Sequence, residues 1–363
     1  MVPLDGESVM SLVTRYLGVS VAISTAFVLL VLVSLFAFTV FIGELDDIGK
    51  GDYTLLKAAL FVAASLPTMA YQLFPTVALL GSVVGLGIMA NNNELLAMRA
   101  AGVSVGQIAI AVMKTGLILV AVNLFLGEAI APITENYAQN LRAVAMTDKI
   151  TLKTRSGFWV RDSAQFVHIR EMFPDGKLGG VAIYEFDERH RLAAITRAAH
   201  AIHIGDAWML HDVTRTNLGQ DAISTERKES MPWGSLLNPQ LVSIVSVQPE
   251  FLSAWGLYNY LGYLKDNGLS YARYEQALWK KLVAPFSTAV MVFLAIPFVF
   301  GSLRSVAIGQ RILVSTLVGI GFYVANQLLN YVGLIYDAPV VISVLAPPLA
   351  FFGLALVLVR RVL

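Results

Sequence analysis

The histidines come nearest to a metal-binding pattern in this chain of 363 residues. His200 and His203 stand three residues apart, but the residues around them are typical of a β-strand and no convincing third ligand follows nearby. Cysteine is absent, which excludes thiolate metal sites and disulfide bonds. We therefore expect no metal ion, and we interpret both histidines as ordinary residues of a folded domain.

Motifs that hold nucleotides or carry out hydrolysis are also missing from the sequence. The pattern G-x-x-x-x-G-K-[ST], whose backbone amides cradle the phosphates of ATP, does not occur. H-E-x-x-H is absent as well, and no G-x-S-x-G stands on a predicted strand-to-helix turn. The chain is therefore not expected to be an enzyme, and it cannot by itself be a complete ATP-driven pump.

A polar connector over residues 91–102 carries a more informative pattern. Asparagines precede it, an acidic residue opens it and a glycine closes it, which is the order of a short capped helix. Two interpretations stay open: a capped connector, or a docking helix for a cytoplasmic partner. In the second interpretation the contact residues are Glu94, Leu95, Met98, Arg99 and Gly102.

The amino-acid composition indicates whether the helices and strands of this chain lie in water or in a membrane. Hydrophobic residues make up 56% of the chain and charged residues only 14%, with a mean hydropathy of +0.67, whereas a soluble protein carries about 25% charged residues. The net charge of +1 argues against nucleic-acid binding. Five charge-free runs are each long enough for a membrane core that needs about 20 helical residues. They are residues 16–43, 58–93, 282–303, 312–336 and 338–359.

A sixth apolar segment, over residues 104–131, contains Lys114 and Glu128. Both charges lie nearer the ends than the middle, and a lysine stem can extend to the membrane interface, so the segment can still span. None of the charge-free runs carries a mid-membrane carboxylate, which disfavours a proton-coupled transporter. The sequence predicts three spans, a polar domain and three further spans.

The polar domain is predicted to be all-β. Four segments rich in aromatic and β-branched residues are separated by turn-like sequences, at intervals of about ten residues. They are residues 157–170, 180–186, 193–204 and 207–214. The spacing favours a sandwich, a jellyroll or an open barrel. The fold class is thus a membrane α-helical protein, with spans one to three in residues 1–132, an inserted all-β (jellyroll-like) domain in 133–278 and spans four to six in 279–363.

Lysines and arginines in the short connections set the expected orientation. If the N-terminus is cytoplasmic, seven of these cations fall on the cytoplasmic side and two on the other. The seven are Arg15, Arg99, Lys114, Arg304, Arg311, Arg360 and Arg361, and the two are Lys50 and Lys57. We therefore expect both termini and the helix at about 91–103 in the cytoplasm, and the large domain outside it.

Several groups of residues resemble one known family in their order and spacing. They are Arg15-Tyr16-Leu17-Gly18, Phe74-Pro75, Ala78-Leu79-Leu80-Gly81, Gly85-Leu86-Gly87, Glu94-Leu95 with Met98, Ala101-Gly102, Val112-Met113-Lys114-Thr115, Gly127-Glu128, Ala131-Pro132, Leu178-Gly179-Gly180 with Ile183-Tyr184, and Phe300-Gly301 with Leu303-Arg304-Ser305-Val306. Over essentially its whole length the chain resembles the LptF/LptG family of lipopolysaccharide export permeases. A further stretch, Gly157-Phe158-Trp159-Val160-Arg161-Asp162, favours the LptG branch.

The resemblance implies a set of partners in the inner membrane. A permease of this family has a periplasmic β-jellyroll between spans three and four, and it pairs with an LptF-like permease. Two LptB-like ATPase subunits supply the energy and bind the ATP and Mg²⁺, and lipopolysaccharide passes to an LptC-like membrane-anchored bridge protein. The resemblance also makes residues 93–102 the docking helix, with Glu94 facing a basic residue of the ATPase.

Lipopolysaccharide carries acyl chains and phosphates, so its site needs an apolar cavity with cations near the outer rim. By the resemblance, this cavity lies between the two permeases, with the first and fifth spans as lateral gates. The expected lipid-binding residues are Phe36, Phe38, Phe41, Arg142, Phe322, Tyr323 and Asn326. The alternative for each aromatic is simple packing or contact with lipid, and for Arg142 an ordinary solvated charge. The first span departs from the family, because it has no lysine or arginine over residues 16–43.

One rival function belongs to a different class. A membrane-anchored periplasmic binding or scaffold protein would need the same spans and domain but would have no transport cycle. Attachment of an ATPase to residues 93–102 separates the two hypotheses, because only the permease requires it.

Overall fold

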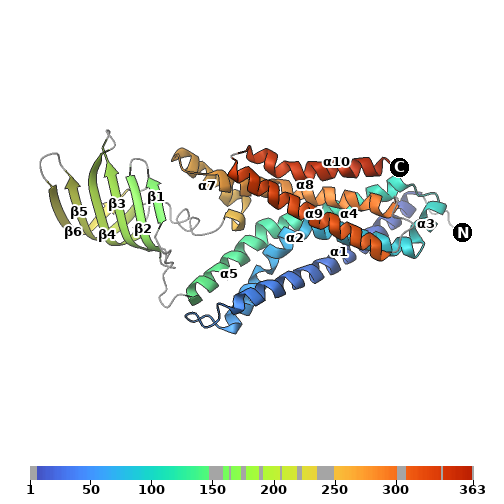
Figure 1. The fold of residues 1–363 in the computed structure, drawn as a ribbon, viewed down its shortest axis with the longest axis horizontal. Helices are drawn as coiled ribbons and strands as arrows, with labels where there is room; N and C mark the ends of the chain where they lie inside the picture. The colour runs from blue at the N-terminus through green and yellow to red at the C-terminus, as the bar shows by residue number, and fades with distance from the viewer. Residues whose placement is uncertain are drawn as a thin grey trace.

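A computed structural model shows a bundle of long helices with one antiparallel sheet beyond one end of the bundle (Figure 1). It describes residues 6–146, 158–162, 165–172, 177–187, 191–204, 207–218, 223–234, 249–300, 308–336 and 338–361. Arg304 and Gly157, which the sequence interpretation used, lie outside these residues.

Among the described residues, six helical segments are long and apolar enough to cross a membrane, which confirms the predicted number of spans. The first three are α1 (Gly6–Leu45), α2 (Leu55–Asn91) and the continuous helix formed by α4 (Val105–Phe125), η1 (Leu126–Ile130) and α5 (Ala131–Met146). The last three are α8 (Ala272–Phe300), α9 (Ile308–Ile335) and α10 (Val340–Val359). The short helix α3 (Glu94–Ala100) connects α2 to α4.

The third span continues to Met146, well past residue 132, where the sequence places the end of the membrane part. Charged and amide side chains mark the level of the membrane surface but do not end a helix, since they are compatible with helical backbone. At residues 126–130 the hydrogen-bond ladder widens to a π-helix. Such π-bulges release backbone groups from the regular ladder and are frequent at functional sites.

Glycines bring α1 and α2 into close contact. A Cβ atom built on Gly81 would lie 2.3 Å from the Cα of Thr25, and one built on Gly85 would lie 3.0 Å from the carbonyl oxygen of Ser20. This spacing of small residues lets two helix backbones approach within the membrane, where van der Waals packing drives association. The Gly81/Gly85 pair is therefore a packing device.

The inserted domain is a six-stranded antiparallel meander in which each strand pairs with the next. Its strands are β1 (Phe158–Asp162), β2 (Gln165–Met172), β3 (Leu178–Phe186), β4 (Leu192–Ile204), β5 (Ala207–Leu218) and β6 (Ile223–Trp233). The single strand predicted over 157–170 is in fact two strands, and β6 was missed because its charged sequence shows no alternation. Buried residues such as Ile169, Ile183 and Leu210 form the core of the sheet.

The chain re-enters the bundle through η2 (Pro249–Phe251) and α7 (Ala254–Asp266). Ser253 caps α7, since its side chain accepts a hydrogen bond from the backbone nitrogen of Gly256. Tyr263 of α7 packs against the core of the sheet. The inserted domain is thus in contact with the helical part of the chain.

Charged residues fasten the sheet-side end of α5 to the end of α1 and to the loop that follows it. Arg142 donates from Nε to Glu44 (2.9 Å) and from Nη2 to Asp47 (2.7 Å), and Glu44 also accepts from the hydroxyl of Tyr53 (2.8 Å). Burial, with the hydrogen bond to Glu44 second, raises the pKa of Tyr53 to about 12. The hydrogen bonds from Lys50 and then Arg142 hold the pKa of Asp47 below its usual range.

The glycine contact predicts a strong effect of adding a single methyl group. Gly81→Ala should lower the thermal midpoint of the detergent-solubilised protein, because forcing extra atoms against the Thr25 backbone costs about 1–3 kcal/mol. Gly43→Ala is the matched control: no atom lies within 4 Å of a Cβ there, so its thermal midpoint should not fall. An equal loss in both variants, measured by fluorescence during heating, would contradict the contact.

The charged cluster predicts a loss of stability in Arg142→Ala. Glu44, whose side chain is 9% exposed, would keep its charge without its cation, and losing a charged hydrogen bond costs about 1.5–3 kcal/mol.

Denaturation should also depend on pH. Because the folded pKa of Asp47 is depressed, its contribution is present above the ordinary value of about 3.9 and is lost as the pH falls through the lower folded value. Asp47→Asn should weaken that acid dependence, and an unchanged acid profile would exclude this origin.

Candidate functional site

The short helix α3 ends at Gly102 as predicted, but its N-terminus is capped differently from the prediction. Asn93 adopts a left-handed conformation (φ 61°) and makes no side-chain cap. Asn92 instead donates a hydrogen bond from its amide to Glu94 (3.2 Å). At the other end Gly102 (φ 92°) allows a Schellman closure, in which the nitrogen of Val103 donates to the carbonyl of Met98 (3.0 Å). The predicted helix is present, but the cap is not made by Asn93.

The two faces of α3 differ from the expected contact surface. Leu95 is only 4% exposed and belongs to the core of the bundle with Leu17 and Leu86, and Met98 packs against the same cluster. Leu95 is therefore covered and Met98 partly covered in this conformation, because helical periodicity turns them inward, and their predicted contact with a partner stays a prediction. Leu96, which is 50% exposed, forms the free face with Arg99.

Glu94 connects α3 to the first span. Its carboxylate accepts a hydrogen bond from the hydroxyl of Tyr16 (2.9 Å), a residue of α1 that lies 78 positions earlier in the chain. The same carboxylate accepts from Asn92 at the end of α2. Since Leu95 also anchors α3 in the core, α3 is fastened to α1 and α2 by both polar and apolar contacts.

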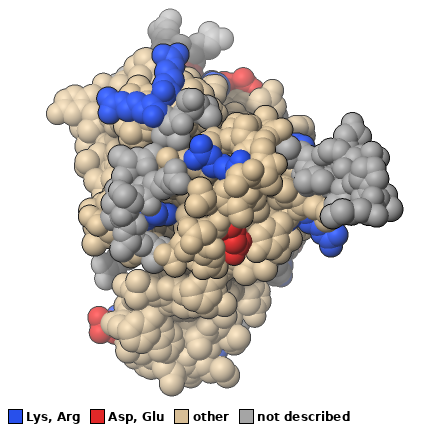
Figure 2. Space-filling model, turned by 90° about the vertical axis from the view of Figure 1, so that its right-hand side faces the viewer, with Lys and Arg blue, Asp and Glu red and all other residues tan. Residues whose placement is uncertain are grey.

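Basic residues gather at the end of the molecule that carries α3. Arg15, Arg99, Arg360 and Arg361 are all exposed there. Figure 2 looks onto this end and shows more surface from lysine and arginine than from aspartate and glutamate. The surface around α3 is thus predominantly positive.

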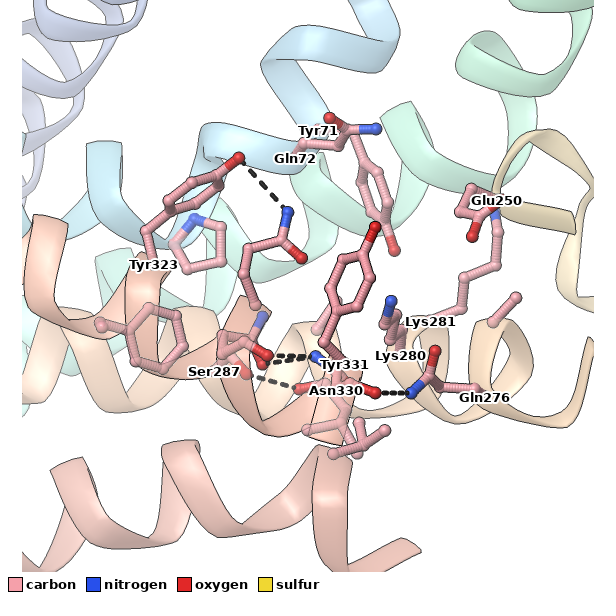
Figure 3. A pocket seen from close by; sticks show the side chains of 18 of the residues that line it. Tyr71, Gln72, Glu250, Gln276, Lys280, Lys281, Ser287, Tyr323, Asn330 and Tyr331 are labelled. Carbon is pink, nitrogen blue, oxygen red and sulfur yellow. Dashed lines mark hydrogen bonds between the residues drawn. The ribbon is translucent and has the colours of Figure 1, made fainter. Parts of the chain in front are cut away.

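A cavity of about 410 Å³ lies among α2, α8, α9 and α10. Figure 3 shows the charged side chains near Glu250 and Gln276 at one end and Tyr323 at the other. Its floor includes Phe322, which is 3% exposed and packs edge-on against Phe351 with ring centroids 5.2 Å apart. The cavity is therefore lined by charged groups, amides and apolar groups.

Two adjacent lysines of α8, Lys280 and Lys281, line this cavity, and Lys281 is bonded to other groups of the chain. Lys281 is 7% exposed and donates from Nζ to the carbonyl of Gly127 (2.8 Å) and to Glu128 (3.1 Å). Glu128 in turn accepts from the backbone nitrogen of Ala254 (2.8 Å), the first residue of α7. The carbonyl of Gly127 belongs to the π-helix, so Lys281 satisfies a group in the irregular part of the third span.

A backbone carbonyl of α9 is bonded to α8, whereas the amide side chains of α9 bond within their own helix. Asn330 is 2% exposed; its side chain donates to the carbonyl of Asn326 (2.6 Å) and its own carbonyl accepts from Gln276 (2.7 Å). Tyr323 accepts a longer hydrogen bond from Gln327 (3.4 Å). This face of α9 is directed toward protein, as amides in hydrocarbon require.

The cavity brings together only part of the predicted lipid-binding set. Phe322, Tyr323 and Asn326 line it, whereas Phe36, Phe38 and Phe41 do not. Phe36 and Phe38 are 41% and 63% exposed on α1, and Phe41 packs against the cluster around Tyr53.

Arg142 is likewise separate from the cavity and is bound by two carboxylates, so it is not an uncommitted phosphate ligand. Lys280 and Lys281, next to Trp279 at the start of a charge-free run, were missed. The signal that could have revealed them is a pair of adjacent lysines directly before a membrane-spanning run.

The histidines of the sheet serve as packing groups. His200 of β4 stacks on His211 of β5 with ring centroids 4.9 Å apart, and His203 meets Trp208 edge-on at 5.0 Å. Within the described part of the chain, no group of three or more His, Asp or Glu side chains is arranged to hold a metal ion.

Comparison with known proteins agrees with this architecture. The family model for the lipopolysaccharide export system permease LptF/LptG matches residues 15–361. The chain is 37% identical over 339 residues to lipopolysaccharide export system permease protein LptG of Haemophilus influenzae, covering 93% of this chain and 95% of that protein. It is also 37% identical over 350 residues to LptG of Escherichia coli K12, covering 96% and 97%.

The match covers the membrane helices and the inserted domain alike, as the sequence resemblance predicted. Six apolar helices and these relatives make the chain a multi-pass protein of the inner membrane and a permease subunit of the lipopolysaccharide export system. The chain belongs to the LptF/LptG family of lipopolysaccharide export system permeases.

Proposed function

We propose that this chain is one half of an ATP-driven permease that takes lipopolysaccharide from the inner membrane and passes it to a periplasmic bridge. An LptF-like permease is the other half, and an LptC-like membrane-anchored protein receives the lipid. The family match over almost the whole chain supports the substrate and the division into subunits. Neither ATP nor Mg²⁺ binds to this chain; both bind to two LptB-like ATPase subunits.

The orientation follows the positive-inside rule. With the α3 end in the cytoplasm, the exposed arginines Arg15, Arg99, Arg360 and Arg361 face the compartment that retains such charges. The sheet lies beyond the opposite end of the bundle and is then periplasmic (Figure 1).

Uncovered apolar surface on two helices supports the pairing with a second permease. None of the residues in the most apolar window of α1 is buried by the rest of the chain, and only 17% are buried in that of α9. Phe38 of α1 and Leu328 of α9 are 63% and 60% exposed. We propose that these faces form the gates of a central cavity shared with the partner, so Phe36, Phe38 and Phe41 act on the lipid there.

The hydrogen bond between Tyr16 and Glu94 is the observation that carries the proposed coupling. The ATPase holds α3 by its exposed face, around Leu96 and Arg99, and closure of the ATPase dimer displaces α3. Glu94 passes the displacement to α1 through Tyr16, while Leu95 and Met98 pass it to the core. A gate helix and the docking helix thus move together.

Two neighbouring leucines test which face of α3 binds the ATPase. Leu96→Ala should leave the thermal midpoint unchanged but reduce the ATPase recovered with the tagged permease about tenfold, the loss typical of one interface anchor. Leu95→Ala should lower the thermal midpoint, because a buried leucine truncation costs about 2–5 kcal/mol.

Quantitative mass spectrometry of the purified complexes measures the recovered ATPase. If Leu96→Ala retained the full complement of ATPase, the exposed face of α3 would not be the docking surface. Normal assembly and export in that variant and in Glu94→Lys would favour the membrane-anchored scaffold instead.

Removing one hydroxyl tests the link between α3 and α1. Tyr16→Phe keeps the ring but loses the hydrogen bond to Glu94, so the complex should assemble and hydrolyse ATP while moving less lipopolysaccharide per ATP. The measurement is phosphate release and lipid transfer to acceptor in the same proteoliposomes. Tyr137→Phe, at an exposed tyrosine of α5 that lies outside the cavity, is the matched control and should keep the wild-type ratio of lipid moved per ATP. A wild-type ratio in Tyr16→Phe would exclude this route.

A further inference from the structure

One lysine of the cavity among α2, α8 and α9 makes no close ionic contact within the described part of the chain. Lys280 lines the cavity beside Lys281, and its ammonium group has no hydrogen bond and no ion pair within 4 Å among the described residues. Lys281, by contrast, is taken up by Glu128 and the carbonyl of Gly127. Adjacent lysines on one helix therefore have different roles.

The remaining charges leave the cavity positive. Apart from the Lys281–Glu128 pair, its charged lining consists of Arg273, Lys280 and Glu250. Glu250 attracts Lys280 without an ion-pair contact. Two cations thus face one carboxylate, and the excess charge lies beside membrane-spanning helices, where an unpaired cation is costly. An anion that enters the cavity would remove this cost.

The other lining groups indicate which anion fits. Next to the cations are side chains that hydrogen-bond neutral hydroxyl groups, namely Tyr71, Gln72, Asn326, Gln327 and Tyr331. The apolar side includes Pro75, Phe322, Leu334 and Val344. Cations, amides and an apolar wall together suit a phosphorylated sugar that is attached to acyl chains.

We propose that this cavity is a subsite for a phosphate group of the exported glycolipid, bound by Lys280 and Arg273, with the cavity amides binding the adjacent sugar. The proposal rests on the proposed export function and adds the residues that recognise the headgroup. It also accounts for the absence of lysine and arginine from residues 16–43 of the first span. The cations are supplied by the fourth span.

The test compares two lipids and two lysines in the whole complex. Complexes containing the permease pair and ATPase are placed in neutral-lipid nanodiscs without ATP. Binding is measured with lipopolysaccharide that carries its lipid A phosphates and with the same lipid after enzymatic dephosphorylation. Lys280→Gln should weaken binding of the phosphorylated lipid about tenfold, the effect of one charge-assisted hydrogen bond, and leave the dephosphorylated lipid unchanged.

Two further variants separate recognition from folding. Lys280→Arg keeps the charge and should retain most of the affinity for the phosphorylated lipid. Lys114→Gln removes a membrane lysine of α4 that lies in a different groove, and it should bind both lipids as the wild type does. Equal loss for both lipids in Lys280→Gln, or no loss for either, would overturn the subsite.

The source of the phosphate is a separate arm of the test. Phosphatidylglycerol added to the nanodiscs should not displace the glycolipid, because it lacks the sugar that the amides bind. Displacement that depends on Lys280 would overturn the proposal in favour of a general phospholipid site. If the wild-type complex bound no lipopolysaccharide at all, the export function itself would fail. Binding by the wild type with indifference to Lys280 would refute only the subsite.

Discussion

Hydrocarbon cannot hydrate a charge or an unpaired backbone group, and this constraint decides where the polar side chains of the chain lie. The π-helix of the third span widens the hydrogen-bond ladder, and Lys281 of the fourth span donates to the carbonyl of Gly127 there. Glu128 balances the charge of that lysine. Each group makes the others tolerable at membrane depth, so the junction of the third and fourth spans depends on all three together.

The same constraint distinguishes the two ends of the helical bundle. At the α3 end, arginines remain exposed and Glu94 is bound by Tyr16 and Asn92. At the other end, charges are gathered into closed clusters such as Arg142 with Glu44 and Asp47. The arginines at the α3 end stay open to solvent, while the Arg142 cluster holds the helices of the chain together.

The sequence predicted the six spans and the inserted β domain because solvation acts residue by residue. Runs without charge reveal their membrane location however the chain folds. The sequence did not reveal contacts between residues that lie far apart in the chain. Arg142 read as a free cation because its two acidic partners precede it by 98 and 95 residues.

The sequence also did not show which side chains of a helix point toward the core. Leu95 and Leu96 are indistinguishable as letters, and only the packing of α3 against the first two spans shows that one is buried and the other exposed. The cavity likewise needs α2, α8 and α9 in their final positions before Lys280 and Tyr323 become neighbours of one space. Two of the five predicted lipid-binding aromatics line the cavity and three do not, since aromatic content alone does not report which side of a helix meets protein.

The carboxylate of Glu128 accepts hydrogen bonds from two donors. One is the ammonium group of Lys281 at the cavity wall, and the other is the backbone nitrogen of Ala254, the first residue of the helix that leads from the sheet back into the membrane. A shared acceptor makes the two places thermodynamically reciprocal. Whatever strengthens its hold on one must alter its hold on the other, and by linkage the free-energy change is the same in both directions. Through this one side chain, the wall of the membrane cavity is linked to the start of the helix that leads from the sheet back into the membrane.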